Sequence, residues 1–266
     1  MENKSREIYK ENFTEYLLCL ALDVGEGMLK NGGEISRVED TIERICHAYG
    51  ALHVEVFTIV SVINASIRMP DGSYSSQMRR VKSTSMNLNM LESLNALSRY
   101  VCQNTPALSE FENMFRKAKQ TRPYPKAVRL LAYGLSAGSF ALFFGGNACD
   151  ALIAFLAGIS VFFVDSLSNR HLTGIAKVFI SSFLISLIAG IGCYLGIGSD
   201  GGMIIIGAIM LLVPGITIGI AMRDIFCGDT LAGLIKLLQA CLSALMIAFG
   251  YFLAVYAIGG LGGVYI

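Results

Sequence analysis

An apolar segment of the chain contains a proline-glycine pair and then three charged residues. The segment, residues 211–233, reads LLVPGITIGIAMRDIFCGDTLAG. A proline removes a helical hydrogen bond, and inside a bilayer such a break persists where protein packing or a water-filled cavity satisfies the freed backbone groups. The segment could therefore line a path for a small polar substrate and exchange protons at its end. Its candidate residues are Pro214, Gly215, Thr217, Arg223, Asp224 and Asp229.

The glycines of this segment also allow a purely structural interpretation. Gly215 and Gly219 are four residues apart, a spacing that lets two membrane helices pack closely without any substrate. For the glycines alone, packing is the simpler interpretation. The charged residues that follow favour a functional one for the segment as a whole.

Polar residues near the ends of other apolar segments form a second candidate group. A carboxylate at the centre of a bilayer costs roughly 2.5–3.5 kcal/mol to insert, so a partly buried one would favour its protonated form and suit a proton-coupled carrier. At a span end it could instead be simply solvated. An arginine matches the two oxygens of a substrate carboxylate, although such an arginine more commonly sets topology or contacts lipid headgroups. The candidates are Asn147, Asp150, Asp165, Asn169 and Arg170.

A third group lies in the stretch NGGEISRVEDTIERI near the N-terminus. The charged residues of this stretch are spaced as in ordinary ion pairing on a helix surface, for example residues 40 and 44, which are four apart. His47 and His53 have no nucleophile or ligand set around them, and the seven cysteines show no metal-ligand spacing. We therefore expect no catalysis, metal or cofactor. The candidates in this stretch are Gly33, Glu34, Arg37, Glu39 and Asp40.

Charge is distributed very unevenly along the 266 residues. Residues 1–126 hold 31 of the 41 Asp, Glu, Lys and Arg residues, whereas the remainder holds 22 of the 28 glycines. A glycine-rich, charge-poor half fits close helix packing in lipid. The net charge of +1 does not indicate a nucleic-acid partner. The unpatterned cysteines suggest free thiols, and no signal peptide is visible.

Five apolar segments after residue 126 are long enough, or nearly so, to span a bilayer, since a span needs about 20 residues. Lys and Arg flank alternate loops, while the loops FGGNACD and GIGSDGG contain neither residue. By the positive-inside rule, the N-terminal domain is cytoplasmic and the C-terminus lies outside the cell membrane. The segments are roughly 127–145, 149–165, 173–196, 203–222 and 231–257.

The N-terminal part has the pattern of an α+β domain. Apolar periodicity predicts helices, and HVEVFTIVSVINASIRM has the alternation of a β-strand that Pro70-Asp71-Gly72 turns into another. The expected helices are 13–30, 34–49, 86–103 and 107–119, with the second strand near 73–81. We thus expect an α-helical polytopic membrane protein. It would comprise a cytoplasmic α+β domain over 1–121, a linker over 122–126 and five spans over 127–266.

Three stretches together resemble the threonine/serine exporter family: GEISRVEDTIERICHAYG, the strand pair with its Pro-Asp-Gly turn, and LVPGITIGIAMRDIFCGDTLAG. The resemblance extends from about Leu17 to Tyr256. It is closest to the larger component of the two-protein form, which works with a separate small membrane protein. Full-length relatives carry both parts in one chain of about ten spans.

The resemblance assigns family positions residue by residue. Glu39 and Asp40 match the acidic pair of the family's first signature, and Gly33 matches the glycine ahead of it. The chain departs from the family pattern at Gly219-Ile220, where relatives usually have a Thr-Asn pair, so the resemblance does not carry a polar substrate contact over to these positions and leaves open a substrate other than threonine. The second signature is matched by Pro214, Gly215, Arg223, Asp224, Gly228, Asp229 and Gly233.

The resemblance implies proton-driven export of a small hydrophilic metabolite, either a threonine- or serine-like amino acid or a short dicarboxylate. A partner of the same family would complete the path, unless a second copy of this chain does so. The competing hypothesis is a membrane-anchored enzyme or regulatory protein whose active part is the cytoplasmic domain. It predicts that a fragment ending near Thr121 keeps its binding or activity. The only support for this hypothesis in the sequence is the charged stretch 34–44.

Overall fold

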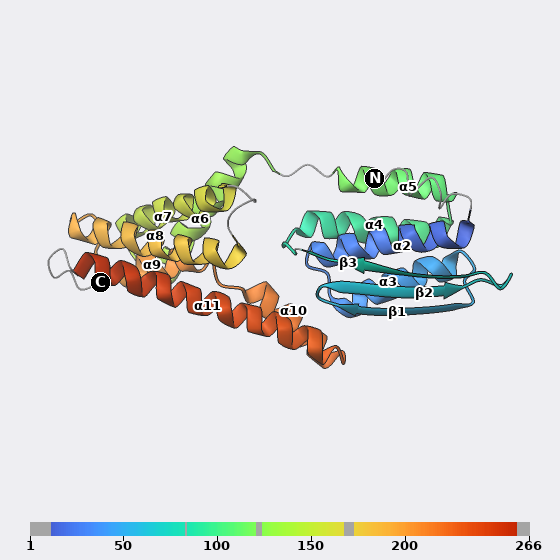
Figure 1. Ribbon diagram of the computed structural model, residues 1–266. Coiled ribbons are helices and arrows are strands. Elements are labelled where there is room, and N and C mark those ends of the chain that lie inside the picture. The colour runs from blue at the N-terminus through green and yellow to red at the C-terminus, as the bar shows by residue number, and fades with distance from the viewer. Residues whose placement is uncertain (1–11, 83, 121–123, 168–172, 260–266) are drawn as a thin grey trace. The chain divides into compact units, whose positions relative to one another are not determined.

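The computed structural model describes residues 12–82, 84–120, 124–167 and 173–259. The chain divides into two compact units (Figure 1). The first consists of Met1–Arg122 together with Gly219–Lys236, and the second of Pro123–Ile218 and Leu237–Ile266. A segment near the end of the chain therefore belongs to the same unit as the N-terminal residues. We call Gly219–Lys236 the elbow and describe each unit by itself.

The first unit is an α+β domain, as the sequence predicted. One face of a three-stranded antiparallel sheet, in the order β1-β2-β3, packs against helices. The predicted helices appear within two residues of their expected ends. The elements are α2 (Phe13–Lys30), α3 (Ile35–Ala48), β1 (His53–Ile59), β2 (Val62–Arg68), β3 (Tyr74–Arg80), α4 (Leu88–Asn104) and α5 (Leu108–Lys119).

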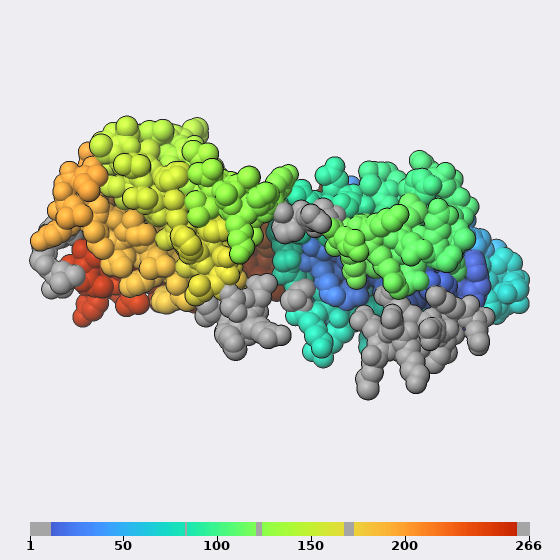
Figure 2. Space-filling model, turned by 90° about the horizontal axis from the view of Figure 1, so that it is seen from above, coloured from blue at the N-terminus to red at the C-terminus, as the bar shows by residue number. Residues whose placement is uncertain are grey.

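Helix α2 is the centre of the first unit. Nearly all of its side chains are buried, because it packs against the sheet, α3, α4 and α5. Phe111 and Phe115 of α5 are buried in the same core, and Figure 2 shows the green side chains of α5 lying over the blue ones of α2. The hydroxyl of Tyr16 donates a hydrogen bond of 2.6 Å to the buried carboxylate of Glu112.

The sequence pattern concealed one turn. The alternating stretch predicted as a single strand over 53–69 is two strands, which pair from His53↔Arg68 to Ile59↔Val62. Val60 and Ser61 make the turn between them. Ser61 is of a type that is common in turns, but Val60 is not, and no glycine, proline, asparagine or aspartate marks the position, so the strand-like alternation continued through the hairpin. The turn at Pro70-Asp71-Gly72 was predicted correctly.

The second unit is helical. Small residues let its helices approach closely: a Cβ added at Gly158 would lie 2.5 Å from the carbonyl oxygen of Tyr133, and one at Gly207 would lie 2.5 Å from the amide nitrogen of Ala141. Its first four helices are α6 (Lys126–Phe143), α7 (Ala148–Ser166), α8 (Gly174–Tyr194) and α9 (Gly201–Ile209). Two further helices, α10 (Gly215–Phe226) and α11 (Thr230–Gly259), each begin in one unit and end in the other.

Three helices in the described part of the chain are long and apolar enough to cross a membrane, namely α7, α8 and α11. The predicted fourth span is interrupted, as the proline-glycine pair indicated. Helix α9 ends at Ile209 and α10 begins at Gly215, with Pro214 directly before it. Residues 203–222 are therefore two short helices and the connection between them.

Candidate functional site

The first turn of α3 is capped by a side chain from the elbow. Glu34 occupies the N-cap position but makes no capping bond with its own side chain. The backbone amide of Ile35 instead donates a 3.3 Å hydrogen bond to Oδ1 of Asp224, which is fully buried. A carboxylate at a helix N-terminus satisfies a free amide and interacts favourably with the helix dipole. Asp224 thus joins two segments that are 189 residues apart in sequence.

Asp224 also forms a buried ion pair. Nζ of Lys236 lies 2.6 Å from its Oδ2, and the lysine side chain is only 12% exposed. Arg223 makes a second link to α3, since its Nη1 donates to Oε1 of Glu34 at 2.8 Å. This arginine is 62% exposed, so water screens its ion pair far more than that of Asp224.

The backbone of the elbow makes this geometry possible. Gly228 has a φ of +102°, which favours glycine, and the amide of Asp229 donates to the carbonyl oxygen of Asp224 at 2.9 Å. A Cβ at Gly233 would lie 2.6 Å from the carbonyl oxygen of Ala221, so only glycine lets α11 begin this close to α10. Ala232 is buried in the core of the first unit.

Glu39 and Asp229 are half-buried carboxylates beside this ion pair. Oε1 of Glu39 accepts a 2.6 Å hydrogen bond from the amide of Thr58 in β1. Burial raises the pKa of Glu39, and the negative charge of Asp229 raises it further. Burial and the charge of Asp224 likewise raise the pKa of Asp229, against the opposing effect of Lys236. The two carboxylates therefore hold protons more readily than exposed ones.

We expect Glu39→Gln to flatten the pH dependence of stability. Because the folded pKa of Glu39 is raised above its ordinary 4.5, the folded state binds this proton more tightly than the unfolded chain. The free energy of unfolding then falls as pH rises from about 4.5 through the raised pKa. Glutamine keeps the acceptor for Thr58 and removes the charge. Thermal unfolding between pH 4 and pH 8 checks this, with the exposed Glu55→Gln as control; an unchanged slope would contradict it.

The other candidates of the N-terminal stretch lie at the surface or in the turn before α3. Arg37 and Asp40 are exposed, and Asp40 pairs with Arg44 at 2.7 Å, as ordinary helix-surface spacing predicted. Gly33 is buried, and a Cβ there would lie 2.9 Å from the carbonyl oxygen of Met28. Of this group, only Glu34 and Glu39 therefore belong to the site at the elbow.

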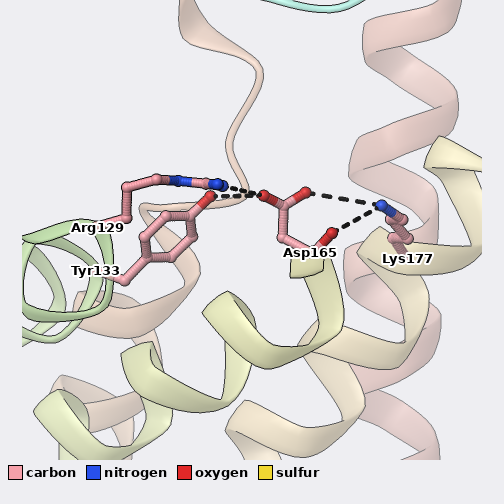
Figure 3. Close-up of polar contacts among 4 residues, drawn as sticks. All are labelled: Arg129, Tyr133, Asp165 and Lys177. Carbon is pink, nitrogen blue, oxygen red and sulfur yellow. Dashed lines mark hydrogen bonds and ion pairs between the residues drawn. The ribbon is translucent and has the colours of Figure 1, made fainter. Parts of the chain in front are cut away.

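Asp165 is the centre of a second polar cluster, in which three helices meet (Figure 3). Its Oδ2 accepts hydrogen bonds from Nη2 of Arg129 at 3.1 Å and from the hydroxyl of Tyr133 at 3.2 Å. On the opposite side, Nζ of Lys177 lies 3.8 Å from Oδ1 and donates to the backbone carbonyl of Asp165 at 3.0 Å. The cluster joins the ends of α6, α7 and α8.

Asn147 and Asp150 form a cap at the start of α7. Each side chain accepts a bond from the backbone amide of the other, which is a capping box. Oδ1 of Asp150 also accepts from the amides of Ser199 and Asp200, at 2.7 and 3.3 Å. Asp150 is 1% exposed. These contacts bind α7 to the loop before α9, so they account for Asp150 without a substrate.

The residues at the helix break have few neighbours. A Cβ at Gly215 or Gly219 would meet no atom within 4 Å, so neither glycine packs closely against another helix in the described part of the chain. Thr217 is half-buried and Gly215 is exposed. The predicted sites at Asn169 and Arg170 lie outside the described residues.

Comparison with known proteins decides the family. The model of the threonine/serine exporter family matches residues 19–258. The chain belongs to this family. It is 26% identical over 248 residues to the "Probable succinate transporter subunit YjjP" of Escherichia coli, covering 92% of this chain and 95% of the relative. Its identity to the protein of the same name in Klebsiella aerogenes is 24%, over 85% and 88%.

A third relative of the exporter family is much longer. The chain is 23% identical to the "Probable threonine/serine exporter" of Mycobacterium tuberculosis over 84% of its own length, but this covers only 43% of that protein. No solved structure matches the chain.

Sequence reasoning missed some of the residues that complete these clusters in this family member. Lys236 was not a candidate, although a single charge inside the 30-residue apolar α11 is itself a sign of a buried partner. Arg129, Tyr133 and Lys177 were not candidates either. No sequence spacing could have revealed that Asp224 reaches the amide of Ile35, because the contact depends on the fold.

Proposed function

We propose that this exporter-family chain is the larger subunit of a secondary transporter that exports small hydrophilic metabolites, and that it is not an enzyme. The observation that carries the proposal is the interrupted segment α9–α10, which leads directly into the elbow bound to α3. In bilayer-spanning proteins, a helix broken near the midplane supplies unpaired backbone amides and carbonyls for a substrate and its coupling ion. The start of α10, at Gly215, would supply amides for a substrate carboxylate.

Proton coupling is the second part of the proposal. Glu39 and Asp229 have raised pKa values and lie where the elbow contacts the first unit. A proton bound there would reduce the repulsion between the two carboxylates and favour the docked elbow. Loss of the proton would weaken the docking. Most of α10 lies within the elbow, and the helix break directly precedes α10, so the change would reach the break.

We further propose five spans, with α6 and the pair α9–α10 completing the three helices that are long and apolar enough. The N-terminal domain, over 1–121, would be cytoplasmic and joined by a linker over 122–126 to a transmembrane domain over 127–266 with its C-terminus outside. Support comes from the positive charges in alternate loops. The protein would reside in the cell membrane.

A small membrane protein of the same family would complete the transporter. Two relatives carry "transporter subunit" in their names, and the chain matches only 43% of the longer exporter. The rest of that longer protein is the length in which a second component would lie. A homo-oligomer is the alternative, and its test is whether the chain transports when it is expressed alone.

Efflux measurements test the proposed function. Cells loaded with labelled succinate, threonine or serine would express the chain with and without the small membrane protein encoded nearest to it. We expect export of one of these metabolites, slowed by a protonophore, only where both proteins are present. Export equal to that of empty cells, although both proteins reach the membrane, would reject the function. Export by this chain alone would support the homo-oligomer.

A further inference from the structure

The cluster around Asp165 carries an excess of positive charge. Arg129 and Lys177 are both cationic, and Asp165 is the one carboxylate that pairs with them among the described residues. An excess of positive charge attracts anions and repels ammonium groups. The cluster therefore has the charge of a site for an anion.

The donors of the cluster are not exhausted by Asp165. An arginine has five N–H donors, and the hydrogen bond from Arg129 to Asp165 uses Nη2. Arg129 and Asp165 are 38% and 44% exposed, so a small solute can reach both. A guanidinium binds a carboxylate through two parallel hydrogen bonds when the geometry allows. Arg129 can therefore donate hydrogen bonds to the carboxylate of a ligand, either beside Asp165 or in its place.

The side chains around Asp165 are held in place before any ligand arrives. The guanidinium of Arg129 lies 5.6 Å from the centre of the Phe162 ring, and the ring of Tyr133 packs edge-on against the same phenylalanine at 5.8 Å. Lys177 is anchored by the backbone carbonyl of Asp165. Donors that are already oriented lose little conformational entropy on binding. Figure 3 shows Arg129 and Tyr133 on one side of the carboxylate and Lys177 on the other.

We propose that Arg129, Tyr133 and Lys177 bind one carboxylate group of a dicarboxylate cargo, and that Asp165 occupies this site when cargo is absent. This inference rests on the proposed transport function and names its substrate class. Cargo that displaces the Asp165 carboxylate also removes its side-chain contacts with Arg129 and Tyr133 of α6 and its ion pair with Lys177 of α8. Binding would thereby loosen the contact between three helix ends. A zwitterionic amino acid fits less well, because its ammonium group would face two cations.

Binding measurements on the full chain test the proposal. The chain, co-expressed with its small partner, would be placed in phosphatidylcholine nanodiscs and titrated with succinate and with threonine by calorimetry. We expect tighter binding of succinate than of threonine. Arg129→Gln and Lys177→Gln should each raise the Kd for succinate by about tenfold or more, the size of one charge-assisted contact. Asp165→Asn should lower the Kd by several fold, because the competing carboxylate loses its charge.

Lys126→Gln is the matched control, because Lys126 is an exposed cation of the same helix and forms no ion pair with Asp165. It should leave the Kd unchanged. Asp165→Glu keeps the competing carboxylate, and the Tm of every variant shows whether its helices are loosened. Together they separate loss of the competitor from loss of helix packing. Tighter succinate binding by Asp165→Asn at an unchanged Tm would support the proposal. A Kd within twofold of the natural chain for both cation variants, or no succinate binding at all, would overturn it.

Two additional measurements distinguish the cargo site from a lipid site and from the transport function. The same titration in nanodiscs containing anionic phosphatidylglycerol asks whether a lipid headgroup is the true ligand. Two results together would overturn the cargo site. Phosphatidylglycerol would compete with succinate in the natural chain but not in Arg129→Gln and Lys177→Gln, and these variants would bind succinate in neutral lipid as the natural chain does. Efflux by the cation variants distinguishes the two proposals. Normal export with unchanged Kd would reject this site and leave the transport function standing, whereas no export by the natural chain would reject the function itself.

Discussion

Replacing Asp224 with alanine is expected to destabilise the first unit by about 3–5 kcal/mol, because it leaves the buried Lys236 without its partner and the first amide of α3 without an acceptor. Loss of the capping contact should increase hydrogen exchange at the start of α3. Efflux should fall with it, since the elbow would no longer be held. Chemical unfolding in detergent and hydrogen exchange measure these effects.

Three variants control for this prediction. Asp224→Asn keeps an acceptor for Ile35 but not the charge, so it should have an intermediate effect. The double variant Asp224→Leu/Lys236→Met should recover most of the stability, because a buried ion pair can often be replaced by apolar side chains. Arg223→Gln breaks only an exposed ion pair and should cost less than about 1 kcal/mol. Equal stability of Asp224→Ala and the natural chain would contradict the buried pair.

Gly207→Ala should have the second largest effect, because its new methyl group would meet backbone rather than a flexible side chain. The added Cβ would lie 2.5 Å from the amide nitrogen and 2.7 Å from the Cα of Ala141 in α6. Overpacking of this kind costs typically about 1–3 kcal/mol. Helix α9 would move away from α6 and displace the break that follows it. We therefore expect a lower Tm and reduced efflux.

Cys193 reports this displacement directly. It is half-buried and packs against the cluster that contains Ile204 of α9. A maleimide should therefore label it faster in Gly207→Ala, while the exposed Cys149 keeps its rate. Gly174→Ala is the matched control: no atom lies within 4 Å of its added Cβ, so better helix propensity should leave it neutral or up to about 1 kcal/mol more stable. Indistinguishable labelling of Cys193 would disprove the tight contact.

Much of the fold could be predicted from local patterns. Apolar periodicity located the helices, and the proline-glycine pair located the break, because both signals are written in neighbouring residues. The hairpin at Val60-Ser61 escaped since its turn residues continue the strand alternation. Asp150 was treated as a coupling candidate, yet the Asn147–Asp150 spacing is that of a capping box and could have suggested the cap.

The candidate site could be predicted only in part. The sequence singled out Glu34, Glu39, Asp224 and Asp229 as charged residues in two separate stretches, but nothing in either stretch indicates that they meet. Their meeting depends on the long-range contact of Asp224 with the amide of Ile35. Pairwise partners of this kind arise from tertiary packing, which composition and spacing do not encode locally. The Asp165 cluster is likewise assembled from three helices.

The grouping of Gly219–Lys236 with the N-terminal residues has a consequence for how the protein is made. A ribosome releases Met1–Arg122 long before it reaches the elbow, so the nascent domain must wait with the first amide of α3 open and without Ala232 in its core. Its completion therefore comes only after residues 219–236 have been made. A fragment that stops at Thr121 lacks the elbow altogether, so its behaviour would be that of the domain without Asp224 and Ala232, not of the finished domain.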